Sequence, residues 1–207
     1  MNLYTLGKAV TYLLVRIIFR IKHEGLENIP EGGGYILACN HQSYCDPPIA
    51  AHKVPMQVRY MAKEQLLKVP VLGFFIRRLG IIPVKRGDGD GSVIDTAIEV
   101  LRDGGILGIF PEGTRNRLED GKMGRVRLGM VQIAGQTGAD ILPMAITYHK
   151  DVRFRKPVTV RYGELIPNGQ LGIDLASRAS LRQASKFVKY KIEALIDLPP
   201  PAQVKDK

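Results

Sequence analysis

The sequence predicts an α/β fold: a single domain whose largely parallel or mixed central sheet is flanked by helices, with an N-terminal amphipathic helix. Two observations lead to this prediction. The 207 residues are enough for one full hydrophobic core and few for two. Along the chain, short apolar runs alternate with stretches of helical periodicity, the pattern of strands packed beneath helices. In such sheets functional residues gather in the loops beyond the strand ends.

The first predicted element is a helix over 3–21 with an apolar face. One stripe of it carries Leu3, Leu6, Val10, Leu14, Ile17 and Ile21. Lys8, Arg16 and Arg20 lie off this stripe, a combination typical of a helix that lies in a membrane interface. A helix packed on the domain core is the alternative. The longest uncharged apolar run there, over 9–15, is too short for a transmembrane span, which needs about 20 residues.

The remaining elements are expected in alternation after a turn-rich linker over 24–34. Strands are predicted over 35–39, 58–61, 81–84, 106–110, 141–148 and 158–162. A helix is predicted to follow Asp46, read as its N-cap with Pro47 in the first turn. Further helices are predicted over 64–79, 92–102, 125–136 and 175–196. This gives a membrane-interface helix over 1–24, a globular domain over 25–198 and a flexible tail over 199–207.

The charge balance predicts an anionic partner. Lys and Arg number 30 against 20 Asp and Glu, a net charge of +10. Such a surplus attracts nucleic acid, the anionic face of a bilayer or phosphorylated molecules. We find no nucleic-acid-binding motif and expect no nucleic-acid partner. The two cysteines, Cys39 and Cys45, are too few for a disulfide scaffold and match no metal or redox spacing, which indicates a reducing, cytosolic-side setting.

A histidine and an aspartate follow the first predicted strand. His41 and Asp46 are five positions apart, which on a regular helix separates them by about 140° around the axis. In a strand-to-helix turn, however, the chain doubles back and the carboxylate can reach the imidazole. An aspartate so placed fixes the histidine tautomer and leaves the second ring nitrogen free to take a proton from a hydroxyl. The alternative is that Asp46 only caps the helix and His41 is an ordinary loop residue.

Cations follow two other strands. The run Pro111-Glu112-Gly113-Thr114-Arg115-Asn116-Arg117 leaves the strand that ends at Phe110. Backbone N–H groups, a hydroxyl and the planar guanidinium fork suit a phosphate, although an exposed turn is the alternative. Lys85 and Arg86 follow the strand over 81–84, where a solvated edge is the alternative.

In their order and spacing these blocks resemble the glycerolipid acyltransferase family, which includes lysophosphatidate acyltransferases. The family pattern is N-H-x4-D, then G-x-x-P-x-x-R, then F-P-E-G-T-R, then a short apolar block around a proline. The matching residues are Asn40-His41…Asp46, Gly80…Pro83…Arg86, Phe110-Pro111-Glu112-Gly113-Thr114-Arg115 and Leu142-Pro143. The resemblance covers about 25–148, so that 25–198 is predicted to be the acyltransferase domain. Arg125 and Arg127, after the third block, are less usual.

The resemblance implies transfer of a fatty acyl group from acyl-CoA or acyl-carrier protein to the free hydroxyl of lysophosphatidate, giving phosphatidate. His41 would be the general base, oriented by Asp46, without an acyl-enzyme. The implied contacts to the acceptor phosphate are Arg86, Glu112, Gly113, Thr114 and Arg115, with Lys85, Arg117 and Lys122 as additional anion contacts and Pro143 as a wall of the acyl pocket. No metal or cofactor is expected. The implied location is the cytoplasmic face of the cell membrane, on anionic lipids, as a peripheral or monotopic protein.

Other functions stay open at this point. The acceptor could be glycerol 3-phosphate, another lysophospholipid or an aminolipid. The same base could activate water in a thioesterase or other hydrolase, or Cys45 could act as the nucleophile with His41. The chain has no G-x-S-x-G motif, which argues against a serine hydrolase. The last alternative is a non-catalytic basic module that binds membranes.

Overall fold

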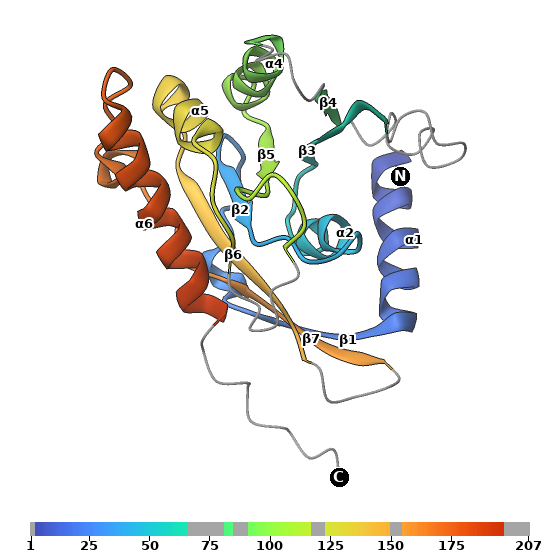
Figure 1. Ribbon diagram of the computed structural model, residues 1–207. Coiled ribbons are helices and arrows are strands. Elements are labelled where there is room, and N and C mark those ends of the chain that lie inside the picture. Colours follow the sequence, from blue (N-terminus) through green and yellow to red (C-terminus); the bar gives the residue numbers. More distant parts are fainter. Residues whose placement is uncertain (1–2, 66–80, 85–90, 117–122, 150–154, 197–207) are drawn as a thin grey trace.

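A seven-stranded sheet organises the part of the chain that the computed structural model describes, residues 3–65, 81–84, 91–116, 123–149 and 155–196 (Figure 1). The strands are β1 (Phe19–Glu24), β2 (Ile36–Cys39), β3 (Val58–Lys63), β4 (Ile82–Val84), β5 (Ile106–Ile109), β6 (Ile141–Tyr148) and β7 (Lys156–Tyr162). Their order is β1-β7-β6-β2-β5-β3-β4. Only the β6–β7 pair among these is antiparallel. The predicted α/β fold with a largely parallel, mixed sheet is confirmed.

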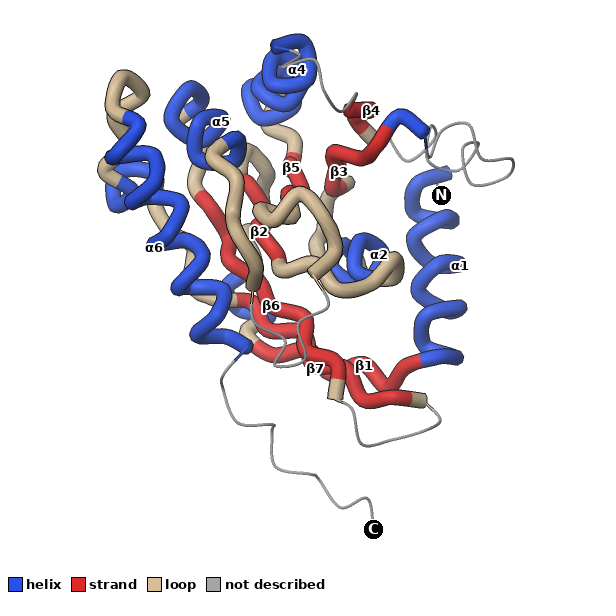
Figure 2. The backbone as a smooth tube through the Cα atoms, viewed as in Figure 1, coloured by secondary structure: helices blue, strands red, loops and turns tan. Residues whose placement is uncertain are grey.

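Helices cover both faces of this sheet, as Figure 2 shows. They are α1 (Leu3–Ile18), α2 (Asp46–Ala51), α4 (Gly91–Arg102), α5 (Gly129–Thr137) and α6 (Arg178–Ile196), with short 3₁₀ turns η1 (Leu26–Asn28) and η3 (Asn168–Leu171). The two faces have separate apolar cores: α1 and α2 pack on one, and α4, α5 and α6 on the other.

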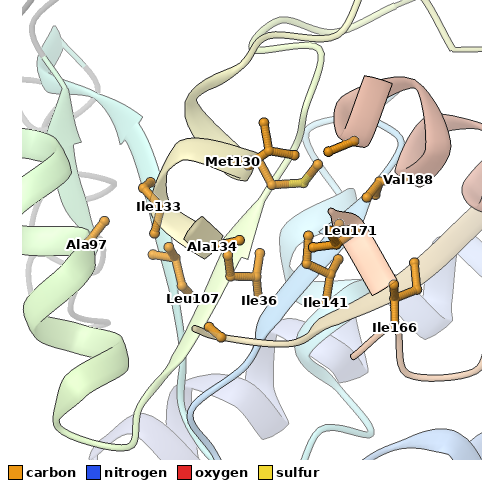
Figure 3. Close-up of a cluster of buried hydrophobic side chains, with 14 of the residues drawn as sticks. Ile36, Ala97, Leu107, Met130, Ile133, Ala134, Ile141, Ile166, Leu171 and Val188 are labelled. Carbon is orange, nitrogen blue, oxygen red and sulfur yellow. The ribbon is translucent and has the colours of Figure 1, made fainter. Parts of the chain in front are cut away.

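Strand β2 contributes to both cores because its side chains alternate in direction. Ile36 and Ala38 point into the core beneath α4, α5 and α6, whereas Leu37 and Cys39 point toward α2. Figure 3 shows the first of these cores, in which strand residues meet residues of α5 and α6. Burying a large aliphatic side chain of this kind contributes about 1.5–3 kcal/mol to stability. Packing on both faces therefore holds β2 in place, and with it the point at which the following loop begins.

The N-terminal helix is shorter than the prediction, and a strand was missed. The helix ends at Ile18, and Phe19–Glu24 forms the edge strand β1, parallel to β7. The strand alternates between partly buried and exposed side chains, which is the period of a half-buried strand. The apolar residues of this segment fit a helical stripe as well as a strand. An ion pair of 2.8 Å between Glu24 and the buried Arg161 ties β1 to β7.

Most other predicted elements are present with shifted ends. Helix α5 begins at Gly129 where the prediction had residue 125, and α6 begins at Arg178 where it had residue 175. Strand β6 has the predicted bounds. The helix predicted over 64–79 lies almost wholly outside the described residues, and the tail predicted over 199–207 lies outside them altogether.

Helix α1 packs against the domain through one face and leaves an apolar face outside. Val15 is buried, the ammonium group of Lys8 donates to the carbonyl of Val54 at 2.6 Å, and Tyr12 stacks on His52. The outer face consists of Leu6, Val10, Leu13, Leu14, Ile17 and Ile18, each 44–63% exposed. In the described part of the chain no helix is long and apolar enough to cross a membrane.

We expect two histidines near α1, His23 and His52, to make the free energy of unfolding depend on pH. Burial and the nearby Lys53 lower the pKa of both His23 and His52 to about 4, whereas an unfolded chain has an ordinary value near 6.5. Between those two pH values the unfolded state binds more protons than the folded state does. The contribution of the two neutral histidines to stability is therefore complete above pH 6.5 and is lost as the pH falls toward 4. Urea midpoints at pH 7 and pH 5 measure the effect. His52→Phe keeps the ring stack and is expected to flatten the dependence; an equal drop in both proteins would contradict this.

Candidate active site

Two loops meet at one edge of the sheet. Strands β2 and β5 are parallel neighbours, so their carboxyl ends lie side by side and the loops that leave them are adjacent. The main chain joins these loops directly, because the N–H of Asn116 donates to the carbonyl of His41 at 2.7 Å. The two most distinctive sequence blocks are therefore brought together.

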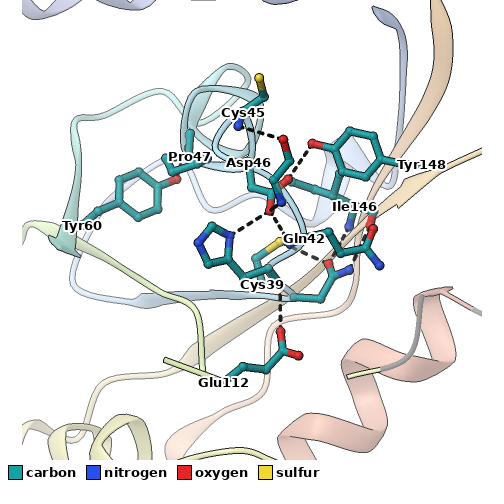
Figure 4. A network of polar contacts seen from close by, with 12 residues as sticks. Cys39, Gln42, Cys45, Asp46, Pro47, Tyr60, Glu112, Ile146 and Tyr148 are labelled. Carbon is teal, nitrogen blue, oxygen red and sulfur yellow. Dashed lines mark hydrogen bonds and ion pairs between the residues drawn. The ribbon is translucent and has the colours of Figure 1, made fainter. Parts of the chain in front are cut away.

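His41 and Asp46 form a close pair in the loop between β2 and α2. The distance between His41 Nδ1 and Asp46 Oδ2 is 2.8 Å. The same Oδ2 accepts hydrogen bonds from the N–H groups of Gln42 at 2.6 Å and Ser43 at 2.7 Å. Figure 4 shows how the carboxylate lies at the centre of these contacts. Asp46 is completely buried, and the His41 side chain is 18% exposed.

The helix-cap role predicted for Asp46 is wrong. Asp46 is the first residue of α2, the cap position belongs to Cys45, and no side chain caps this helix. The carboxylate turns back toward the preceding loop, where the N–H groups of Gln42 and Ser43 and the imidazole are available to it. The turn that brings His41 and Asp46 together is thus held by the carboxylate itself.

Aromatic rings fix the other side of the imidazole. The His41 ring stacks on Phe110 with 4.1 Å between centroids, and Phe110 stacks in turn on Tyr60 at 5.6 Å. Because Nδ1 faces Asp46, Nε2 lies on the opposite side of the ring, facing away from the carboxylate. This arrangement leaves Nε2 as the nitrogen that can accept a proton.

Glu112 connects three segments of the site. The residue is 4% exposed, and its carboxylate accepts the N–H of His41 at 2.9 Å and the N–H of Gly124 at 2.8 Å. Gly113 follows with φ 66°, and a Cβ there would lie 2.6 Å from Nε of Arg127. The geometry therefore gives Glu112 backbone partners where the sequence pattern led us to expect a contact with phosphate. The left-handed φ at position 113 therefore favours a glycine there.

Arg115 lies against an exposed tyrosine of the neighbouring loop. Its Nη2 donates to the hydroxyl of Tyr44 at 2.7 Å, and the guanidinium carbon is 3.5 Å from the centre of the Tyr44 ring. Such stacking orients the planar fork, which suits bidentate recognition of phosphate. Thr114 and Arg127 are exposed on the same loops. Lys85, Arg86, Arg117 and Lys122 lie outside the described residues, and Pro143 is buried in β6 opposite Ala38.

Several contacts have no local signal in the sequence. The side-chain amide of Asn40 continues the sheet, donating to the carbonyl of Ile146 at 2.9 Å and accepting its N–H at 2.8 Å. The hydroxyl of Tyr148, the last residue of β6, donates to Asp46 Oδ1 at 2.6 Å. Only the pairing of β2 with β6 reveals these neighbours.

The two cysteines give no sign of a thiol nucleophile. Burial, together with the Asp46 and Glu112 carboxylates, raises the pKa of Cys39 well above its ordinary value, so this thiol stays protonated. The sulfur of Cys45 points away from the Asp46 carboxylate (Figure 4).

A mixed α/β sheet thus carries a buried carboxylate beside an imidazole at its carboxyl edge, next to a loop that presents arginine, which agrees with the resemblance to the glycerolipid acyltransferase family. The chain belongs to the acyltransferase family, because the family model described as Acyltransferase matches residues 20–147.

Individual relatives agree with this assignment. A 1-acyl-sn-glycerol-3-phosphate acyltransferase of Bacillus subtilis is 36% identical over 126 residues, 60% of this chain and 61% of the relative. A lyso-ornithine lipid O-acyltransferase of Pseudomonas aeruginosa is 31% identical over 113 residues, 54% of this chain and 42% of the relative. The crystal structure of the 1-acyl-sn-glycerophosphate acyltransferase PlsC from Thermotoga maritima has a TM-score of 0.72 and 27% identity, covering 95% of this chain and 81% of that one. This chain thus spans about 61% of the length of the Bacillus relative.

Proposed function

We propose that the protein transfers a fatty acyl group from an acyl thioester to the free hydroxyl of lysophosphatidate and so produces phosphatidate for phospholipid synthesis. Relatives that act on 1-acyl-sn-glycerol 3-phosphate support this choice of acceptor. The observation that carries the proposal is the 2.8 Å contact between His41 Nδ1 and Asp46, which turns Nε2 away from the carboxylate beside the loop that presents Arg115.

The mechanism follows from this arrangement. Asp46 accepts the Nδ1–H of His41, so Nε2 takes the proton of the acceptor hydroxyl while its oxygen attacks the thioester carbonyl. The tetrahedral intermediate collapses, the C–S bond breaks, and the departing thiolate takes the proton from the imidazolium. A positioned base contributes about 10²–10⁴-fold, and holding both substrates together can contribute much of the rest. Because a thioester is already activated, we propose no metal, cofactor or acyl-enzyme.

The acceptor phosphate is assigned to the cations at the rim of the site. Arg115, oriented by Tyr44, offers its guanidinium fork, and Arg127 adds a second exposed cation near Gly113. Glu112 supports the loop through the N–H groups of His41 and Gly124, since its negative charge would repel a phosphate. The Thr114 hydroxyl can add a donor, whereas the N–H of Gly113 donates to the carbonyl of Phe110 at 2.9 Å within its own turn. Lys85, Arg86, Arg117 and Lys122 stay predicted contacts, and Pro143 stays a predicted wall of the acyl pocket.

An acceptor panel tests the proposed function. Purified protein would be supplied with labelled acyl-CoA or acyl-carrier protein and with lysophosphatidate, glycerol 3-phosphate, lyso-ornithine lipid or lysophosphatidylcholine. We expect the highest kcat/KM with lysophosphatidate, and the donor pair shows which thioester the enzyme uses. A higher value with any other acceptor would overturn the assignment of lysophosphatidate. Release of free fatty acid without acceptor would indicate a thioesterase.

We also propose that the outer face of α1 lies in the interface of the cytoplasmic leaflet. Leu13 and Ile17 are neighbours on that face, 63% and 58% exposed, and partial burial of two such side chains in lipid is worth about 10- to 100-fold in affinity. Leu13→Gln with Ile17→Gln is therefore expected to weaken binding to anionic vesicles by about that factor, measured by sedimentation. Tyr190→Gln is the control, because Tyr190 is 67% exposed and belongs to α6, which packs on the other face of the sheet. Equal binding of both variants would remove this proposal.

A further inference from the structure

We infer that Tyr148 is a positioning residue of this site: its hydroxyl holds the Asp46 carboxylate toward His41 and thereby sets the proton affinity of the imidazole. Its kinetic consequences rest on the proposed function, but its effect on the imidazole does not. The contact joins residues 102 positions apart, so it exists only because the sheet brings the end of β6 to the start of α2.

The carboxylate is held at both of its oxygens. Oδ2 accepts His41 Nδ1 and the N–H groups of Gln42 and Ser43, all from the loop that precedes α2. Oδ1 accepts the Tyr148 hydroxyl at 2.6 Å, from the other side and from a different element. An O–H···O⁻ bond of this length belongs to the strong, charge-assisted class. The loop alone can hold one oxygen; Tyr148 fixes the rotation of the carboxylate plane.

The position of Tyr148 is itself well determined. Asn40, the residue before His41, bonds to both main-chain groups of Ile146, which locks β6 against the start of the site loop. Tyr148 lies two residues after Ile146 and therefore on the same face of the strand, toward α2. The ring packs edge-on against Phe19 of β1, with 5.5 Å between centroids and 67° between planes. The hydroxyl is thus held by the sheet and by its neighbours.

The Tyr148 hydroxyl donates to Asp46 and also has a hydrogen bond with the Ser43 side chain, which lowers its pKa. Burial, and then the Asp46 carboxylate, raise the pKa of Tyr148 well above its ordinary value, so the phenol stays protonated and donates. A donor on Oδ1 draws negative charge away from Oδ2 and weakens the stabilisation of an imidazolium at His41. Removing it should make His41 more basic. Among the residues that the structure describes, the other titratable groups near the pair are Glu112 from the loop after β5, Tyr60 from β3, Cys39 from β2 and Cys45 before α2.

Tyr148→Phe removes the hydroxyl and keeps the ring, and Tyr60→Phe is its matched control. Tyr60 is also a buried tyrosine beside α2, and its hydroxyl donates to the carbonyl of Pro47 at 3.1 Å (Figure 4). We expect Tyr148→Phe to lower kcat at neutral pH about 10-fold, the lower end of the loss seen when a group that orients a metal-ligating histidine is removed, with KM for both substrates little changed. The midpoint of the acidic limb of kcat against pH should move upward, whereas in Tyr60→Phe it should stay in place.

An NMR titration of the His41 imidazole gives a second measurement that needs no activity. The titration midpoint should rise in Tyr148→Phe, and 3-fluorotyrosine at position 148, a stronger donor, should lower it. An unchanged midpoint in both proteins would overturn the inference. So would a fall in kcat with no change in the pH profile, since that is the result of a merely structural role. An inactive wild-type protein would instead refute the proposed function and leave the titration as the test of Tyr148.

Discussion

His41→Ala is expected to lower kcat for acyl transfer by about 10²–10⁴-fold, the usual contribution of a positioned general base. Nε2 is the only nitrogen of this ring that faces away from Asp46, so no other atom of the pair can take the hydroxyl proton. The side chain is 18% exposed, and its main-chain bonds to Glu112 and Asn116 survive the substitution. The expected result is therefore a folded protein with a normal KM for lysophosphatidate and very low turnover.

The measurement is kcat and KM with labelled acyl thioester, together with the urea midpoint of the variant. His52→Phe, which lies beneath α1, serves as the histidine control and should retain activity. Retention of more than about a tenth of the wild-type kcat by His41→Ala would mean that the base lies elsewhere, because a general base is worth at least about 10²-fold. A protein that binds membranes equally well with and without His41 but transfers no acyl group would fit the non-catalytic alternative.

Asp46→Asn is expected to reduce both activity and stability. The carboxylate accepts four hydrogen bonds, and an amide has one oxygen and an NH₂ group that would face a donor. Loss of a charge-assisted bond costs about 1.5–3 kcal/mol, and the amide also favours the wrong tautomer of His41. In serine proteases the equivalent change lowers kcat about 10⁴-fold, so we expect a loss on the order of 10²–10⁴-fold here.

A matched substitution distinguishes the two effects. Asp140→Asn changes another, partly buried carboxylate, whose Oδ1 accepts the N–H of Asn168 at 2.8 Å just before β6. It should lower the urea midpoint and leave kcat unchanged. If Asp46→Asn reduced stability alone, with turnover like that of the Asp140 variant, Asp46 would be a purely structural carboxylate.

Local patterns predicted the parts of this site that lie close together in sequence. The five-residue spacing of His41 and Asp46 sits in one strand-to-helix turn, so a chain reversal was enough to bring them together. The partners of Glu112 could not be predicted, because the sequence does not show which backbone N–H groups will lie near a carboxylate. Tyr148 was missed for a related reason: its target is determined by which strand lies beside β2.

The secondary structure was also predictable only where the local pattern fitted a single type of element. Strand β6 is apolar and long, and its predicted bounds are those of the structure. Strand β1 was assigned to the preceding helix because its apolar residues fit both periods, and only pairing with β7 decides between them. Tertiary contacts thus determined the elements for which the local pattern was ambiguous.

Helix α1 runs into the edge strand β1 without an intervening loop, since one ends at Ile18 and the other begins at Phe19. On the proposal that α1 lies in a membrane interface, the helix would set the tilt of the sheet and with it the depth at which His41 meets its substrates. In that arrangement the protein would reach its lipid substrate by diffusing over a plane, with the loop that carries His41 at a constant distance from it.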